Sequence, residues 1–475
     1  MAGEMVAAYY GKDCDSREMF KDLKIAQDPS FETHLNNYNV IFLNIQKFWS
    51  KTYDLLKMKE NLQSSILWDL QEQYSSVRYF DKTDLTRSLS DIFAQTGEGF
   101  IFIVDEWDCL FREVKGEPDI WKVYLDFLRN LFKDAEYAEM VYMTGILPIK
   151  KYGSHSALNM FTEYSMTDPL ELAEFVGFTE SEVESLCKRY NMDFDETKRW
   201  YDGYRFPEVG SIYSPKSVVE AMLHKKFNTY WNKTETFEAL KIYIEINFEG
   251  LRESVVRLLA GDRIVINPNK FSNDMVTFGS IDDVFTLLVH LGYLGYDSEN
   301  QEVFIPNSEV STEFVNAIEG ANWKPVVDAI KASDQLIQNT WQKNATEVAE
   351  AIDTAHIENA SILSYNNENS LACIISLAYY SAKKYYTIIR ELPTGKGFAD
   401  LVFLPRPNHA DKPAMVVELK WDKSTDSAIQ QIKEKRYIAG FVVAGFKTAP
   451  PGQLLLVGIN YDKETKKHEC VIEVA

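Results

Sequence analysis

Features that mark secreted, membrane-spanning and zinc-binding proteins are scarce in this sequence of 475 residues. Its 5 cysteines are scattered, without C-x-x-C pairs or the density of a disulfide framework, which indicates a reducing compartment. No apolar run approaches the roughly 18 residues of a membrane helix, and no basic start precedes an apolar core at the N-terminus. The histidines show no ligand spacing, which argues against zinc. We therefore expect a cytoplasmic protein without a membrane span.

Positive charge is also in short supply. Lys and Arg number 50 against 71 Asp and Glu, and the net charge of −21 argues against non-specific nucleic-acid binding by the whole chain. The deficit is uneven, because residues 358–475 carry 15 Lys and Arg against 13 Asp and Glu. A nucleic-acid partner is therefore compatible with the C-terminal part.

The first 150 residues alternate between strand and helix patterns. Near-continuous apolar runs at 37–45, 97–108 and 138–147 are typical of parallel strands buried on both faces. The helical patterns between them predict an α/β layered sheet. Shorter helical pieces follow, including a helix and small hairpin over 282–310, and from about 358 the pattern is helix, strand, strand, helix, strand.

Two strand-like runs near the C-terminus, GFADLVF at 397–403 and MVVELKW at 415–421, carry charges where a buried strand would carry none. Strand side chains alternate between faces, so Glu418 and Lys420 share one face, and a hairpin would bring Asp400 opposite Glu418. Adjacent carboxylates repel each other and lose solvation, and a shared Mg²⁺ ion removes that objection. Lys420 would then orient a water or stabilise a pentacovalent phosphate, so the pattern predicts phosphodiester hydrolysis.

Helical patterns on either side of these runs offer two further polar residues. Gln431 lies on an otherwise apolar helical stripe. Glu368 stands at the start of an apolar helix, where it either satisfies the helix dipole or points into the same site. The alternative for the charged runs is a solvated strand end at 418–420, with Asp400 paired to Lys396 or Lys420.

The motifs GFADLVF, VVELKW and AIQQIKEKRY together resemble the PD-(D/E)XK nuclease superfamily. The order of VDEWD, TGILPI, GFTESEV, WYDGYRF and IPNSEV along the chain resembles, more narrowly, a bacterial family that joins an AAA-ATPase-like domain to such a nuclease. The resemblance implies that Asp400 and Glu418 are metal ligands, that Lys420 is the catalytic lysine, and that Glu368 and Gln431 support the site.

The resemblance also implies an α/β fold in three domains. Residues 1–175 would form an AAA-ATPase-like core around a P-loop-NTPase-like parallel sheet, 176–355 a helical lid and winged-helix-like region, and 356–475 a restriction-endonuclease-like domain. We interpret the aromatic cluster in WYDGYRF as core packing around a tight turn, rather than as a base-stacking platform.

The run FIFIVDEWD ends in acids, as a Walker B strand does. Asp105 would hold Mg²⁺ through water, and Glu106 would activate the attacking water. Thr144, at the end of the next strand, lies where a sensor residue would contact the γ-phosphate. The alternative is that these acids cap the following helix, a role that Asp108 can also fill.

A glycine-rich phosphate loop, G-x-x-x-x-G-K-[ST], is missing from the sequence. In the resembling family this loop, with the strand before it, comes immediately ahead of a helix like the one expected at residues 1–20. We therefore expect either a truncated chain or a natural short form that does not bind ATP normally, with ATP as a cofactor only of a longer form. A gap in the sheet would expose a strand edge, so self-association is expected.

These patterns predict a Mg²⁺-dependent nuclease attached to an AAA-ATPase-like module. The expected partner of the nuclease is nucleic acid, and DNA is the first candidate. The competing hypothesis is a non-catalytic regulatory or nucleic-acid-binding protein that keeps the nuclease fold as a scaffold. The missing phosphate loop and the acidic N-terminal part favour this second hypothesis.

Overall fold

The computed structural model describes residues 2–475 apart from 115–116, 149–150, 153–154, 157, 232–249, 272–277, 321–322, 360–367, 395–396 and 435–453. Contacts divide the chain into two units, residues 1–170 with 268–291 and residues 171–267 with 292–475. The predicted α/β fold class is confirmed, whereas the division into three domains stays a prediction. Among the described helices, none combines the length and the apolar character needed to cross a membrane.

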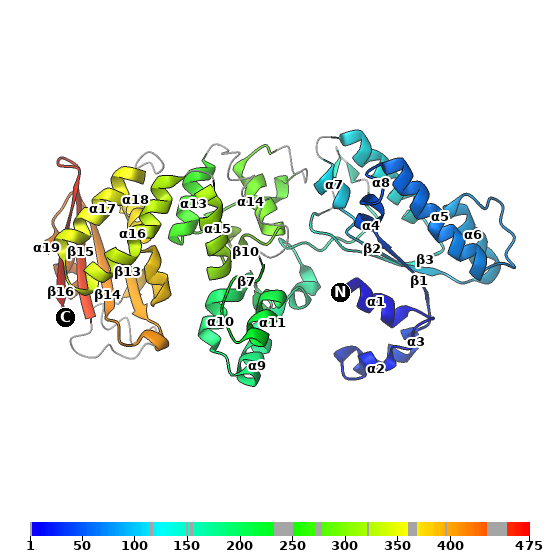
Figure 1. Ribbon diagram of the computed structural model, residues 1–475, viewed down its shortest axis with the longest axis horizontal. Helices are drawn as coiled ribbons and strands as arrows, with labels where there is room; N and C mark the ends of the chain where they lie inside the picture. The colour runs from blue at the N-terminus through cyan, green and yellow to red at the C-terminus, as the bar shows by residue number, and fades with distance from the viewer. Residues whose placement is uncertain are drawn as a thin grey trace. The chain divides into compact units, whose positions relative to one another are not determined.

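A parallel sheet with the strand order β1-β2-β3 forms the centre of the first unit (Figure 1). The strands are β1 (Asn39–Asn44), β2 (Phe100–Asp105) and β3 (Ala138–Met143). The first five residues of β2 are buried, as expected for a central parallel strand. Each predicted run contains its strand, but the acidic segment after Asp105 turns away from the sheet.

Helices flank this sheet, with α1 packed on β1 and β2 and the Phe132 ring of α8 lying 5.3 Å from the ring of Phe102. The helices of the unit are α1 (Ala2–Tyr10), α2 (Arg17–Phe20), α3 (Phe31–His34), α4 (Ile45–Trp49), α5 (Leu55–Gln73), α6 (Leu85–Thr96), α7 (Cys109–Glu113), α8 (Pro118–Phe132) and α14 (Ile281–His290). A short pair, β4 (Lys151–Tyr152) and β5 (His155–Ser156), completes it.

The N-terminal half of the second unit contains a mixed sheet with the strand order β6-β8-β7-β10-β11-β9. The strands are β6 (Phe178–Thr179), β7 (Asp202–Phe206), β8 (Gly210–Tyr213), β9 (Ile264–Val265), β10 (Gly295–Asp297) and β11 (Glu302–Phe304). The antiparallel pair β10–β11 confirms the predicted hairpin. Helices of this part are α9 (Glu180–Tyr190), α10 (Phe194–Tyr201), α11 (Pro215–His224), α13 (Leu251–Ala260), α15 (Ser308–Gly320), α16 (Lys324–Trp341) and α17 (Ala345–Asn359).

The C-terminal sheet has the strand order β12-β13-β14-β15-β16, with β14 and β15 parallel and the other neighbours antiparallel. The predicted elements are α18 (Glu368–Ala378), β13 (Gly397–Pro405), β14 (Ala414–Trp421), α19 (Thr425–Glu434) and β15 (Leu454–Asp462). The sequence reading missed two strands at the sheet edges, β12 (Tyr386–Thr394) and β16 (Lys467–Val474).

The two faces of this sheet are covered by different helices (Figure 1). Ile429 and Ile432 of α19 pack in one core cluster with Val402 and Val416. On the opposite face, Tyr379, just after α18, lies against Phe403 with ring centroids 5.3 Å apart. Strand side chains alternate between faces, so Asp400 shares the face of Val402, and Glu418 and Lys420 share the face of Val416. The three charged residues therefore extend the face that α19 covers.

Candidate active site

Asp400 belongs to β13 and lies beside β14, at the end of this hairpin that is far from the connecting turn. The antiparallel ladder runs from Phe403 opposite Met415 to Leu401 opposite Val417. One position further, the Asp400 side chain contacts the neighbouring strand, because its Oδ2 accepts the Leu419 N–H at 2.7 Å. The predicted neighbourhood of Asp400 and the 418–420 segment is therefore present.

Glu418 and Lys420 are buried, at 1 % and 7 % exposure, and are not a solvated strand end. Lys420 Nζ lies 2.9 Å from Glu418 Oε1. A buried carboxylate or ammonium without a partner is strongly destabilising, so the ion pair explains how both can occupy the interior. The pair also places the ammonium group directly beside the Glu418 carboxylate.

The helix α19 brings Gln431 to the same carboxylate, where its Nε2 donates to Glu418 Oε1. Gly458 of β15, paired with Glu418, lies under this helix: a Cβ there would be 3.0 Å from the Thr425 carbonyl oxygen. The close approach of α19 to the sheet therefore depends on a missing side chain. The sequence reading missed Gly458, although a glycine inside an apolar strand indicates a close approach of backbone.

Asn460 is a second residue that the sequence reading missed. It is 2 % exposed and pairs with Lys420 across the β14–β15 ladder. Its Oδ1 accepts the Lys423 N–H at 3.0 Å, which holds the turn between β14 and α19. In that turn Asp422 adopts a left-handed φ of 58°, so Asn460 supports a strained connection that positions the helix.

Glu368 is the first residue of α18, as predicted. Its side chain lies outside the described residues, as does all of Lys396, so the predicted contribution of Glu368 to the site stays a prediction.

The donor set fits a hard divalent cation. Asp400 and Glu418 supply carboxylate oxygens from adjacent strands on one face, and Mg²⁺ is commonly held by one or two carboxylates while it keeps several waters. Within the part of the chain that the structure describes, no cluster of three or more His, Cys, Asp or Glu side chains is arranged to hold a metal. A site here would therefore rest on two protein carboxylates completed by water or substrate oxygens.

In the first unit, Asp105 and Thr144 meet at the carboxyl ends of β2 and β3. Thr144 Oγ1 donates to Asp105 Oδ1 at 2.6 Å, and Asn44 Nδ2 donates to Asp105 Oδ2 at 3.1 Å. The three strand ends therefore present one polar cluster, whereas the nucleotide roles expected of Asp105 and Thr144 stay predictions. Asn44 was not predicted, although it ends an apolar run in the same way.

Glu106 follows with a left-handed φ of 56°, a strained backbone for a residue other than glycine. Its carboxylate forms an ion pair with Arg112 of α7. This geometry turns Glu106 out of the strand direction and holds its carboxylate at Arg112.

Asp108 is the N-cap residue of α7, but its side chain makes no capping hydrogen bond. It is fully buried, and its Oδ2 accepts the N–H groups of Ile146 and Leu147 at 3.1 and 2.9 Å, with Arg112 Nε at 3.2 Å. The side-chain cap considered from the sequence is therefore wrong, because the carboxylate holds the loop after β3 instead.

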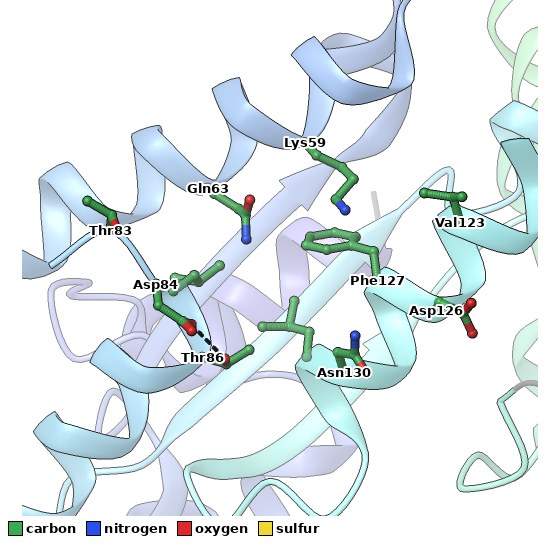
Figure 2. Close-up of a pocket in the computed structure, with 11 residues that line it drawn as sticks. Lys59, Gln63, Thr83, Asp84, Thr86, Val123, Asp126, Phe127 and Asn130 are labelled. Carbon is green, nitrogen blue, oxygen red and sulfur yellow. Dashed lines mark hydrogen bonds between the residues drawn. The ribbon is translucent and has the colours of Figure 1, made fainter. Parts of the chain in front are cut away.

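A separate pocket of about 470 Å³ lies between α5, α8 and the start of α6 (Figure 2). Within its lining, Lys59 Nζ lies 5.3 Å from the centre of the Phe127 ring. The pocket contains none of the predicted site residues.

Two family models match the chain, one in each of the regions described above. Residues 1–154 match the model described as Predicted AAA-ATPase, and residues 366–470 match the PD-(D/E)XK nuclease superfamily. A curated relative from Azotobacter chroococcum mcd 1, described as "Uncharacterized protein in vnfD 5'region", is 27% identical over 149 residues. That match covers 30% of this chain and 28% of the relative.

Proposed function

We propose, from the premise that the chain joins an AAA-ATPase-like domain to a PD-(D/E)XK nuclease superfamily domain, that it hydrolyses phosphodiester bonds of DNA with Mg²⁺. The observation that carries the proposal is the convergence of Asp400, the Glu418–Lys420 pair and Gln431 at one end of a buried sheet face. A structural role alone would not call for a buried acid and a buried ammonium, with a half-buried acid on the next strand, where apolar residues stabilise as well or better.

Each side chain has a distinct role in this proposal. Asp400 and Glu418 would hold Mg²⁺, which when bound polarises the phosphate and lowers the pKa of a bound water. Lys420 would orient the attacking water or stabilise negative charge on the phosphate. Gln431 would fix the orientation of the Glu418 carboxylate, since it donates to Oε1.

For the first unit we propose a nucleotide-dependent role in which Asp105, Glu106 and Thr144 act on Mg²⁺ and the γ-phosphate. The hydrogen bond between Thr144 and Asp105 supports this assignment. Such a role needs a glycine-rich phosphate loop, which the printed sequence does not contain.

The test is Mg²⁺-dependent cleavage of plasmid and single-stranded DNA by the purified chain. Asp400→Asn and Lys420→Met should lower the rate by about 100-fold or more, in the range seen when one stabilising charge or donor is removed. Asp411→Asn is the matched control, because this exposed acid lies on the connection between the same two strands. Addition of EDTA should abolish cleavage, and Mg²⁺ should restore it.

Equal rates in all three variants would refute the assignment of the site. DNA retention on a gel without cleavage, unchanged in Glu418→Gln, would instead support the non-catalytic, nucleic-acid-binding alternative. In that case, the acids would serve the fold of a scaffold.

A further inference from the structure

A cavity of about 160 Å³ lies in the second unit, lined by the β7–β8 hairpin, the segment before β10 and the start of α15. Two of the sequence motifs, WYDGYRF and IPNSEV, contribute to its wall. The residues proposed for DNA cleavage and for the nucleotide are all outside its lining. These motifs therefore meet around a space that the proposed nuclease function does not use.

The cavity has an acidic lining. Among the described residues that line it, Glu309 is the one with a formal charge, and none is Lys, Arg or His. Glu309 is 1 % exposed, and its Oε1 accepts the N–H groups of Tyr230 and of Trp231, the latter at 2.8 Å. Within the described residues, no donor contacts Oε2. One oxygen therefore holds the chain at 230–231, and the other is available to a ligand.

Tyr213 borders the cavity, but its side chain packs in the core cluster with Val183, Cys187 and Val218, and none of these three residues lines the cavity. Its buried hydroxyl therefore belongs to that core and not to the cavity wall.

Aromatic rings complete the wall. Tyr204 and Trp231 both line the cavity. Gly292 has a left-handed φ of 82°, and a Cβ there would lie 3.1 Å from Trp231, so this glycine leaves room for the indole ring. Aromatic faces attract organic cations, especially where water is excluded.

We propose that this cavity binds an alkylammonium ion, held by Glu309 and by the aromatic rings of Tyr204 and Trp231. The acidic lining opposes a phosphate or carboxylate ligand, because either would lie against a buried carboxylate that no cation among the described lining residues offsets. An ammonium group offers three donors, one of which can bond to the second carboxylate oxygen of Glu309. The ion can come from a free polyamine or from a lysine side chain of another polypeptide, and both present the same chemistry.

The test measures binding to the full chain by calorimetry and by the shift in Tm. We expect n-butylammonium to bind and raise the Tm, and the neutral 1-butanol of equal length to do neither. Glu309→Gln keeps the oxygen that accepts the two backbone N–H groups but removes the charge, so the affinity should fall at least tenfold while the unliganded Tm changes little.

Glu347→Gln is the matched control, because this exposed first-turn acid of α17 loses the same charge away from the cavity. It should bind n-butylammonium as the wild type does. If putrescine binds more tightly than Nα-acetyl-lysine methylamide, the natural ligand is assigned as a free polyamine. If the lysine derivative binds more tightly, the ligand is assigned as a lysine of another polypeptide. Either result supports the proposal. Wild type that responds equally to n-butylammonium and 1-butanol, or to neither, would overturn it, as would unchanged affinity in Glu309→Gln.

Discussion

Replacement of Gly458 by alanine should separate α19 from the sheet and thereby loosen the candidate active site. The new Cβ would lie 3.0 Å from the Thr425 carbonyl oxygen and 3.2 Å from both Ala428 Cβ and Ile429 Cγ1. Because the nearest of these atoms is backbone, a side-chain rotation cannot relieve the contact, and the helix must move by a few tenths of an ångström. We expect the variant to lose about 1–3 kcal/mol of stability, the usual cost of overpacking a core.

The same shift should affect function more than stability. Gln431 is carried by α19 and donates to Glu418, so outward movement of the helix weakens the contact that orients this carboxylate. Supporting partners of this kind typically contribute about 10–100-fold to metal affinity or activity. The Mg²⁺ concentration for half-maximal cleavage should therefore rise by about that factor, while DNA binding without metal stays unchanged.

A double-mutant cycle tests whether crowding is the cause. Ala428→Gly removes one of the three crowding atoms, at about 1 kcal/mol of lost helix stability when made alone. If the two side chains collide, the double variant should be more stable than the sum of the single changes by about 0.5 kcal/mol or more. Wild-type Tm and cleavage in Gly458→Ala would refute the reasoning, as would strict additivity in the cycle.

Three further predictions concern other parts of the chain. Asp108→Asn should lower the stability of the first unit by about 1–3 kcal/mol, because it removes a buried charge that accepts two loop N–H groups and contacts Arg112; an unchanged thermal transition would contradict this. Burial, with a smaller effect from His468, lowers the pKa of His356 to about 4 from its usual 6.5, so the unfolded chain binds a proton that the folded chain excludes. The stability that comes from keeping His356 neutral is fully present above about pH 6.5 and is lost as the pH falls towards 4, by about 3 kcal/mol at most. The urea midpoints of unfolding at pH 7 and pH 5 should therefore differ less in His356→Asn than in the wild type. Finally, β3 pairs with β2 alone among the described strands, and most of its apolar side chains are half-buried. Size-exclusion chromatography should therefore show concentration-dependent association, which Val141→Lys should reduce. A monomer at every concentration would contradict this prediction.

The strands and acids of the candidate site could be predicted because their signals are local. Alternation along β13 and β14 fixes which side chains share a face, and a hairpin needs only a short connection. Gly458 and Asn460 could not be assigned in the same way. Their roles depend on how close α19 comes to β15, and no periodicity in either segment encodes that distance.

The two missed edge strands have a similar explanation. In β12 the apolar pattern is broken by Arg390 and by Glu391, which has a left-handed φ of 50°, and a proline follows at 393. Strand β16 alternates apolar with charged residues, as an edge strand with one exposed face does. Asp108 was misjudged because its partners lie 38 and 39 residues along the chain, where helix-cap rules do not reach.

The hydrogen bond from Leu419 to Asp400 gives this acid a second duty, independent of chemistry. Alanine at this position would leave the buried Leu419 N–H without an acceptor. Lost activity in that variant would therefore combine the loss of a metal ligand with a local distortion of the sheet. Asparagine, which keeps an oxygen that can accept this hydrogen bond, separates the two effects. A descendant that had abandoned hydrolysis would still be under pressure to retain an oxygen-bearing residue here. Retention of the aspartate is therefore not by itself a sign of a working enzyme.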